Sequence, residues 1–528
     1  MKIVIADPLP KSASAVLREQ GWTVDTQSAR PLDKLLIDIA DADALIVRSA
    51  TKVTSQVIEA APTLKIIARA GTGVDNVDLD AANRRGVLVV NAPGANSISV
   101  AEHACALILT LSRSVSHADA QMKDGRWEKK SFQGTELRGK TLGLVGLGRI
   151  GREVAVRCRA FDMNIVAHDP YISTQVAQDL GVELLSLDEL CHRADFISLH
   201  IPSSTNTKQL FGRDQLAQCK SGMRLVNTAR GELIDETALA EAIKSGRVAG
   251  AGLDVFQVEP PRSTDLTGLP QVVCTPHIAA STKEAQELVG VETATSVKEF
   301  LLSGVVRNAV NFPALPAEEF RRLQPYTSLA ERLGSLLAQL TDERIEGVGV
   351  RYYGELAGKT HDMLVGAVLV GLLRQALSST ITLVNAHSIA TQRGIEVIES
   401  QSSRARDFTS LISVKIFTKS GERWAEGAVF APSEPRLVLL DGVAIEASLE
   451  GELIVIHNSD RPGVIGKVGT ILARDEVNIA TFALGRGPDG AVGVVNVESS
   501  GEDQAVKKEV ISELQNISEV CTARLVRL

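Results

Sequence analysis

The stretch that decides the fold reads Thr141-Leu-Gly-Leu-Val-Gly-Leu-Gly-Arg-Ile-Gly151. It begins as a short apolar run, typical of a buried strand, and passes directly into the glycine pattern Gly146-x-Gly148-x-x-Gly151. Residues 152–161 then follow the periodicity of a helix. In such a pattern the first glycine permits a tight turn, the second lets backbone approach a pyrophosphate, and the third lets helix and strand pack closely. The succession of strand, glycine turn and helix therefore predicts an anion-binding site at the N-terminus of this helix.

A second strand specifies the ligand of this site. Residues 164–168 are typical of the next strand, which ends at Asp169, about 20 residues after the last glycine. A carboxylate there accepts hydrogen bonds from the adenosine ribose hydroxyls and repels a 2′-phosphate. We therefore predict NAD, rather than NADP, as the cofactor. A glycine-rich turn in an ordinary parallel sheet is the alternative, and it leaves the spacing unexplained.

Length and composition limit the class of protein. A chain of 528 residues exceeds what one core usually organises, so three or four domains are expected. The net charge of -8 argues against a nucleic-acid partner. Residues 363–373, the longest apolar stretch, are about half a membrane span, and residues 1–6 are typical of a strand rather than a signal sequence. The six scattered cysteines predict small buried side chains in a reducing, cytoplasmic compartment.

The residues before the glycine pattern predict a first lobe. Apolar runs at 2–6, 44–48, 64–70 and 87–91 alternate with helical patterns, as in a parallel sheet covered on both faces. Ligands of such sheets bind at the carboxyl ends of the strands. That is the position of Arg48, Ser49, Arg69, and the loop 71–76, which contains Thr72 and Gly73. Loop N–H groups suit a carboxylate and the arginines suit a phosphate or a second carboxylate, so we predict an anionic substrate.

The remaining chain divides into further units. Residues 97–115 predict one long helix and 123–130 an exposed basic segment; strands at 196–201, 224–227 and 272–275 continue a second parallel sheet. A helix at 282–302 then returns to the first lobe. We therefore predict an α/β fold with two Rossmann-like lobes: a substrate lobe, 1–97 with 283–312, and an NAD lobe, 98–282.

Prolines near residues 311–316 predict a boundary, followed by an α+β portion at 316–447. Residues 452–528 have the order strand, helix, strand, strand, helix, strand, which is ferredoxin-like. The strands are expected at 453–457, 479–484, 490–497 and 520–528, and the helices at 463–476 and 502–514.

Three polar residues follow apolar strands of the second lobe: Arg230, Glu259 and His277. Oxidising a secondary alcohol with NAD requires a base for the hydroxyl proton, and imidazole suits this at neutral pH. A carboxylate beside the other ring nitrogen would set the tautomer, and a guanidinium can hold a substrate carboxylate. Each residue alone is more often structural, but their roles complement one another. No metal is required.

These motifs, in this order within a discontinuous first lobe, resemble the D-isomer-specific 2-hydroxyacid dehydrogenases. Residues 69–76 and the C-terminal module are similar to the long-form branch that acts on 3-phospho-D-glycerate. The resemblance implies that Arg230 orients the substrate, that Glu259 is the partner of the histidine and that His277 is the acid/base. It implies that substrate phosphate or carboxylate meets Arg48, Ser49 and Arg69. It places at the cofactor Arg149, Ile150, Asp169, Thr207, Thr228, Ala229, Arg230, Asp254, His277 and Ala280.

The C-terminal module resembles an ACT domain, a regulatory fold that binds amino acids at subunit interfaces. Asn458, Asp460 and Asn478 match its ligand-binding positions, which implies L-serine as an effector. A purely dimerising module is the alternative. The portion at 316–447 resembles the intervening domain of long-form enzymes, where an anion can bind. The resemblance also implies that the segment around Lys129 can reach a neighbouring subunit's site.

The expected function is NAD-dependent oxidation of 3-phospho-D-glycerate to 3-phosphooxypyruvate, the first step of L-serine biosynthesis, inhibited by L-serine. The expected assembly is a homo-oligomer, a dimer or a tetramer. Another 2-hydroxyacid, such as 2-hydroxyglutarate or glycerate, is an alternative substrate. An NAD-sensing protein similar to a corepressor is an alternative of another class, against which the ACT-like module argues.

Overall fold

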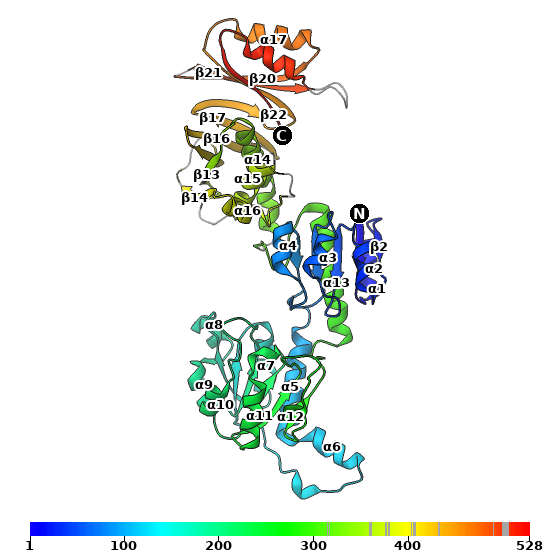
Figure 1. Ribbon diagram of the computed structural model, residues 1–528. Helices are drawn as coiled ribbons and strands as arrows, with labels where there is room; N and C mark the ends of the chain where they lie inside the picture. The colour runs from blue at the N-terminus through cyan, green and yellow to red at the C-terminus, as the bar shows by residue number, and fades with distance from the viewer. Residues whose placement is uncertain are drawn as a thin grey trace.

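The computed structural model arranges the chain in four sheets along an elongated molecule (Figure 1). The N-terminal sheet lies between the sheet of the glycine motif and the two C-terminal sheets. Two parallel sheets, one mixed sheet and one antiparallel sheet confirm the predicted fold class. The structure describes all residues except 314, 316, 358–361, 375–376, 378–380, 403, 405–407, 431–432, 489 and 499–505.

The first sheet is parallel, with the order β2-β1-β3-β4-β5. Its strands are β1 (Lys2–Ile5), β2 (Thr23–Asp25), β3 (Ala44–Val47), β4 (Ile66–Arg69) and β5 (Leu88–Val90). Its helices are α1 (Lys11–Arg18), α2 (Leu32–Asp38), α3 (Ser55–Glu59) and α4 (Leu79–Arg85). The long helix α13 (Lys283–Ser303) returns to this sheet, where Ala294 and Val297 join the core of Ile3 and Ile5.

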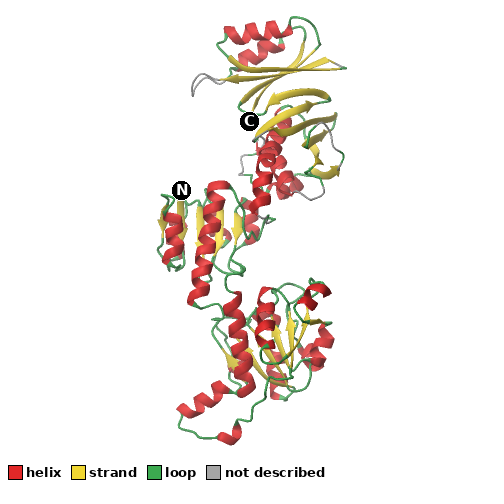
Figure 2. Ribbon diagram, turned by 180° about the vertical axis from the view of Figure 1, so that it is seen from behind, coloured by secondary structure: helices red, strands yellow, loops and turns green. Residues whose placement is uncertain are grey.

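A helical pair leads away from this sheet. The predicted helix 97–115 is shorter than expected: α5 (Ser97–Arg113) ends because Ser114 adopts a left-handed φ of 51°, and α6 (Val115–Lys123) continues at an angle of 67°. The arm formed by α6 and the 3₁₀ turn Lys129–Ser131 projects from the body (Figure 2), with Trp127 78% exposed. Among the described helices none alone has the length and apolarity of a membrane span; α5 and α6 as a bent pair meet that test by length and composition only.

The second sheet has seven parallel strands in the order β12-β11-β10-β9-β6-β7-β8. They are β6 (Thr141–Val145), β7 (Asn164–His168), β8 (Glu183–Leu184), β9 (Phe196–Leu199), β10 (Met223–Asn227), β11 (Val248–Leu253) and β12 (Val272–Cys274). The helices are α7 (Arg149–Arg159), α8 (Thr174–Asp179), α9 (Leu187–Arg193), α10 (Arg213–Gln218), α11 (Glu236–Lys244) and α12 (Thr264–Thr267). Apolar clusters cover both faces, as predicted for a buried parallel sheet.

The third sheet, with the order β14-β13-β15-β16-β17-β18, is mixed because only β13 and β14 are parallel. Its strands are β13 (Ile345–Gly354), β14 (Glu396–Ser402), β15 (Ser410–Thr418), β16 (Gly421–Phe430), β17 (Glu434–Leu440) and β18 (Val443–Ser448). Its helices are α14 (Ala317–Gln339), α15 (Asp362–Arg374) and α16 (Ala386–Gln392). The longest apolar stretch of the sequence, 363–373, is buried within α15.

The fourth sheet is antiparallel, with the order β20-β21-β19-β22. Its elements are β19 (Glu452–Asn458), α17 (Val464–Arg474), β20 (Asn478–Gly487), β21 (Gly490–Glu498), α18 (Lys508–Gln515) and β22 (Val520–Arg527). This is the predicted ferredoxin-like arrangement. The helix expected at 502–514 begins with residues 502–505, which lie outside the described residues.

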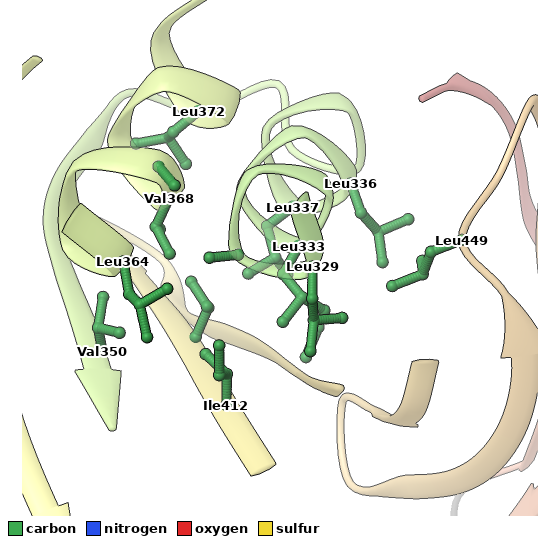
Figure 3. Packing of buried hydrophobic residues seen from close by; sticks show 14 of the residues in the cluster. Leu329, Leu333, Leu336, Leu337, Val350, Leu364, Val368, Leu372, Ile412 and Leu449 are labelled. Carbon is green, nitrogen blue, oxygen red and sulfur yellow. The ribbon is translucent and has the colours of Figure 1, made fainter. Parts of the chain in front are cut away.

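The third and fourth sheets share one core. Figure 3 shows α14 beside α15, with leucines of α14 facing α15 and Ile412 of β15, and with Leu449 facing Leu336 from the other side of α14. The same cluster includes residues of three strands of the fourth sheet: Leu453, Val455, Val492, Val494 and Val526. Polar contacts reinforce it, since Arg524 Nη1 lies 2.9 Å from Asp342 Oδ1 and Gln339 Nε2 donates to the Arg527 carbonyl at 2.9 Å.

A second contact joins the third sheet's helices to the first sheet. Thr382 Oγ1 donates to the Gly86 carbonyl at 2.9 Å, and Asn385 Nδ2 donates to the Arg84 carbonyl at 3.4 Å. Both acceptors lie at the C-terminal end of α4, whose N-terminal end follows the predicted substrate loop 71–76. The loop and the C-terminal half of the chain are therefore connected through one short helix.

The cysteines depart in part from expectation. Cys105, Cys158, Cys191 and Cys219 are buried and free, as predicted. Cys274 and Cys521 are exposed, which corrects the prediction for these two. These two cysteines are exposed because they lie on β12 and β22, which are edge strands with one neighbouring strand each.

Candidate active site

The glycine motif forms the turn between β6 and α7. Gly146 has a φ of +98°, and a Cβ there would lie 2.6 Å from the His200 carbonyl oxygen. A Cβ on Gly151 would collide with the Gly146 carbonyl, so these two glycines allow the turn and the close packing. A Cβ on Gly148 would meet no atom within 4 Å. That open side of the turn, at the start of α7, is what an approaching phosphate needs.

Asp169 lies directly beyond β7 and contacts this turn. Its Oδ2 accepts a hydrogen bond from the Leu147 amide at 2.8 Å, and its Oδ1 accepts one from the Tyr171 amide at 2.9 Å. Each carboxylate oxygen can still accept a second bond. The side chain therefore braces the turn and retains acceptor capacity for ribose hydroxyls.

Other groups near the motif have unused hydrogen-bonding capacity. The buried Thr228 hydroxyl and both ring nitrogens of His200 lack a partner among the described residues. Burial lowers the pKa of His200 to about 4, so the ring is neutral at physiological pH. His200 carries no sequence signal of its own. Together with the open turn, these groups fit a nucleotide cofactor that would supply the missing partners.

Most of the other residues predicted at the cofactor make contacts within the protein itself. The Thr207 hydroxyl donates to the Pro202 carbonyl, and the Ala229 amide donates to the Asn227 side chain at 3.0 Å. Arg149 lies against Gly94, and Ile150 packs on the core of the second sheet. Ala280 follows the loop of His277. Their predicted contacts with the cofactor stay predictions.

Three neighbouring strands bring the predicted catalytic residues to one edge of the second sheet. Arg230 follows β10, Glu259 follows β11, and His277 follows β12, and these strands are adjacent and parallel. His277 Nδ1 donates to Glu259 Oε2 at 2.7 Å, and Glu259 Oε1 accepts from the Phe256 amide at 3.1 Å. A Cβ on Gly231 would collide with the backbone of Phe256 and Gln257, so the loop of Arg230 packs directly against the loop that leads to Glu259.

Asp254 positions the loop that carries His277. Its carboxylate is fully buried and accepts hydrogen bonds from the Thr275 hydroxyl at 2.6 Å and from the amides of Ile278 and Ala279 at 2.8 and 2.9 Å. Burial raises the pKa of this carboxyl, but the hydrogen bonds, first that from His103, outweigh burial and lower the pKa overall. Asp254 is therefore an ionised support of the loop, and its predicted contact with the cofactor stays a prediction.

The side chain of Arg230 reaches the first sheet. Its Nη1 donates to the Ala229 carbonyl at 2.7 Å, and its Nη2 forms an ion pair of 3.0 Å with Asp75 Oδ2 in the loop 71–76. A Cβ on Gly73 would collide with the same guanidinium, so this glycine permits the close approach. Asn227 holds the loop by donating to the Arg230 carbonyl at 2.8 Å. Asp75 lies in the predicted substrate loop 71–76, but no signal in the sequence predicts its contact with Arg230 or the contact of Asn227 with that residue.

The predicted substrate residues lie around this ion pair. Burial lowers the pKa of Arg69, and the positive charges of Arg230 and Arg48 lower it further. The Arg69 Nε is buried without a partner among the described residues. The Thr72 hydroxyl donates to Asn96 Oδ1 at 2.9 Å, and Ser49 is exposed. The structure thus brings three guanidinium groups together, an arrangement suited to an anion with more than one charge.

Two supporting residues of this region could not be found from the sequence. Asp7 accepts hydrogen bonds from the Arg48 amide at 2.6 Å and the Thr51 hydroxyl at 2.8 Å. Asn76 Nδ2 donates to the carbonyls of Arg48 and Thr51, both at 2.6 Å. Asp7 follows β1 and Asn76 follows β4, whereas Arg48 and Thr51 follow β3, so no local pattern predicts these contacts.

The three predicted effector residues do not meet within one chain. Asn458 pairs with Ala491 at one end of β21, whereas Asn478 pairs with Glu498 at the other end. Seven residues of strand separate these points, about 23 Å at 3.3 Å per residue. Asp460 lies near Asn458, 3.3 Å from the Arg486 Nε. Asn458 and Asn478 can contact one small ligand only if two chains associate.

Two family models match the chain. Residues 105–279 match the NAD binding domain of the D-isomer specific 2-hydroxyacid dehydrogenases, and residues 322–441 match the D-3-phosphoglycerate dehydrogenase intervening domain. Among solved structures, the TT0316 protein from Thermus thermophilus is 38% identical with a TM-score of 0.54, over 59% of this chain and 100% of that chain. The D-lactate dehydrogenase from Escherichia coli is 29% identical with a TM-score of 0.54, over the same shares. The fold and the nucleotide site are therefore those of an NAD-binding D-isomer specific 2-hydroxyacid dehydrogenase.

Relatives that match the whole chain narrow this class. The D-3-phosphoglycerate dehydrogenase of Methanocaldococcus jannaschii is 43% identical over 99% of this chain and 100% of the relative. That of Archaeoglobus fulgidus is 40% identical over 100% of both, and that of Mycobacterium tuberculosis 44% identical over 92% of both. This chain belongs to the D-3-phosphoglycerate dehydrogenase family, in the long form that contains the intervening domain.

Proposed function

We propose that this chain oxidises 3-phospho-D-glycerate to 3-phosphooxypyruvate as the first step of L-serine biosynthesis. The observation that carries the proposal is the His277–Glu259 hydrogen bond, formed by a loop that packs against the loop of Arg230. The charges of Arg230 and Arg48 in turn act on Arg69. The residues that hold NAD are the glycine turn with Gly148, Asp169 and Thr228. NAD supplies the acceptor for the hydride of the alcohol carbon.

The hydrogen bond to Glu259 determines the protonation of the catalytic histidine. An ionised carboxylate only accepts hydrogen bonds, so His277 Nδ1 carries the proton and Nε2 is free to act as a base. Nε2 takes the proton of the substrate hydroxyl, and the Glu259 carboxylate stabilises the imidazolium that forms. In the reduction direction the same nitrogen returns the proton. Arg230 holds the substrate carboxylate and orients the carbon that reacts.

Charge defines the substrate class. The phosphate and carboxylate of 3-phospho-D-glycerate match the guanidinium groups of Arg48, Arg69 and Arg230 better than the single carboxylate of glycerate does. Replacing Arg48 by Ala therefore affects oxidation of the phosphorylated substrate far more than oxidation of glycerate. An equal effect on both would favour another 2-hydroxyacid, such as 2-hydroxyglutarate.

One assay tests the function: NADH formation with 3-phospho-D-glycerate, glycerate and 2-hydroxyglutarate, by the wild type and His277→Ala. We expect 3-phospho-D-glycerate to be the best substrate, and the variant to lose roughly 10²- to 10⁴-fold in kcat while still binding NAD. His192→Ala, at an exposed histidine of α9, is the control and keeps the wild-type rate. An unchanged rate in His277→Ala would overturn the assignment.

The regulatory part of the proposal rests on the C-terminal sheet. Asn458 and Asp460 of one chain and Asn478 of a second chain bind L-serine, with the N-terminus of α17 facing its carboxylate. This requires a homo-oligomer, a dimer or a tetramer, in the cytoplasm. The units are a substrate lobe (1–97 and 283–312), an NAD lobe (98–282), an intervening domain (316–447) and an effector domain (452–528). Millimolar L-serine in the same assay lowers the rate; no change in rate or sedimentation contradicts this part.

A further inference from the structure

The ion pair between Arg230 and Asp75 is unexplained by the proposed chemistry. It joins the loop after β10 in the second sheet to the loop after β4 in the first. Asp75 is a carboxylate, as is the group that Arg230 receives from the substrate under the proposed function. The two carboxylates therefore compete for the same guanidinium.

The surroundings explain why a carboxylate is needed there before the substrate arrives. The charges of Arg48 and Arg230 both act on Arg69, whose side chain is half-buried. Asp75 and Asp7 supply negative charges that act on Arg69. Asp7 already accepts three hydrogen bonds from Arg48 and Thr51, so it is committed to the backbone. Asp75 is therefore the acid of this cluster that can change partners.

The geometry allows Asp75 to leave. Its side chain is 74% exposed, whereas that of Arg230 is 29% exposed, so release moves the carboxylate into water and leaves the guanidinium in place. Arg230 keeps its bond to the Ala229 carbonyl, which holds the orientation of the guanidinium without Asp75. Once a ligand with several negative charges occupies the arginines, repulsion favours release.

We propose that Asp75 is an exchangeable counter-ion of Arg230, which neutralises the arginine cluster between turnovers and is displaced by the carboxylate of the incoming substrate. It is a positioning residue that sets substrate affinity: every substrate molecule must replace an existing ion pair. The inference rests on the proposed role of Arg230.

The test compares Asp75→Asn with Asp80→Asn. The first change removes the charge and keeps the size of the side chain. The second removes the same charge from an exposed position in the first turn of α4, where no contact with Arg230 is present. Two quantities are measured on the full-length protein: the KM and kcat for 3-phospho-D-glycerate, and the affinity of the NAD-loaded protein for oxalate by calorimetry.

We expect Asp75→Asn to lower the KM and the oxalate Kd by roughly two- to fivefold, the size of one partly exposed ion pair, and to raise kcat/KM. Asp80→Asn leaves both close to wild type. A KM and an oxalate Kd that are unchanged or higher in Asp75→Asn, or equally lowered in Asp80→Asn, overturn the proposal. Oxalate binding needs no turnover, so a wild type inactive on 3-phospho-D-glycerate disproves the proposed function while the oxalate affinities still decide the role of Asp75.

Discussion

At the scale of single residues, Asp169 has two tasks that can be separated. Its carboxylate braces the glycine turn through the amides of Leu147 and Tyr171, and under the proposed function it also rejects the 2′-phosphate of NADP. Replacing it by Ala should therefore weaken NAD binding and, relative to NAD, raise the kcat/KM with NADP by roughly tenfold, about 1.4 kcal/mol.

Steady-state kinetics with both cofactors check this prediction. Asp214→Ala serves as the control. It removes the same charge from an exposed position in the first turn of α10, another helix of the second sheet. If NADP use stays negligible in Asp169→Ala, another group excludes the phosphate and Asp169 serves only the turn.

The residues that could be predicted are those with a local signal. Arg230, Glu259 and His277 each lie in the loop that follows an apolar strand, and the ends of neighbouring parallel strands meet at one edge. His103 and Asp75 could not be predicted, because their partners belong to other elements. His103 lies in the middle of α5, 3.0 Å from the Thr275 hydroxyl that binds Asp254. A polar residue on a mostly buried helix has no pattern that distinguishes it from a surface position.

At the scale of elements, the strands of the first two sheets whose bounds could not be given from the sequence are short or rich in small residues. β2 and β8 have three and two residues. β11 reads Val-Ala-Gly-Ala-Gly-Leu, whose small residues have low β-propensity. A Cβ on Gly252 would lie 3.0 Å from Leu107 of α5, so helix packing, which no local pattern shows, selects the small residues.

Helix α4 is the element that connects the substrate loop to the C-terminal half of the chain. Gly86 ends this helix with a φ of +68°, and a Cβ there would lie 2.5 Å from Thr382 Oγ1 and 2.8 Å from Asn385 Nδ2. Gly86→Ala should cost about 1–2 kcal/mol for the left-handed backbone and also displace these two side chains. We expect faster amide hydrogen exchange in residues 382–392.

Gly21→Ala separates the two effects. Gly21 has a similar φ of +72°, but a Cβ there would meet no atom within 4 Å. This variant should lose comparable backbone stability and keep the exchange of 382–392 unchanged. Equal exchange in the two variants would show that the contact does not connect α4 to the third sheet's helices.

At the scale of the whole molecule, the order of strands and helices at 452–528 predicted a ferredoxin-like sheet but could not show what covers its second face. In the structure, α18 and α17 cover one face of the fourth sheet, and α14 with the third sheet covers the other. An effector held at the fourth sheet would therefore act on the third sheet through a shared core. From there the contact of Thr382 and Asn385 leads to α4 and the substrate loop.

Two neighbouring residues of β19 test whether this shared core unfolds as one unit. Val455 and Ile456 are both 1% exposed, but Val455 packs in the cluster of α14, whereas Ile456 packs in the cluster of α17 and α18. Replacing either by Ala should cost about 1–3 kcal/mol of stability. Val455→Ala should speed amide hydrogen exchange in α14 as well as in the fourth sheet, and Ile456→Ala should speed it chiefly in α17, α18 and that sheet. If the exchange of α14 is the same in Val455→Ala as in the wild type, the two sheets are separate cooperative units. The path from the effector domain to the substrate loop would then need another connection.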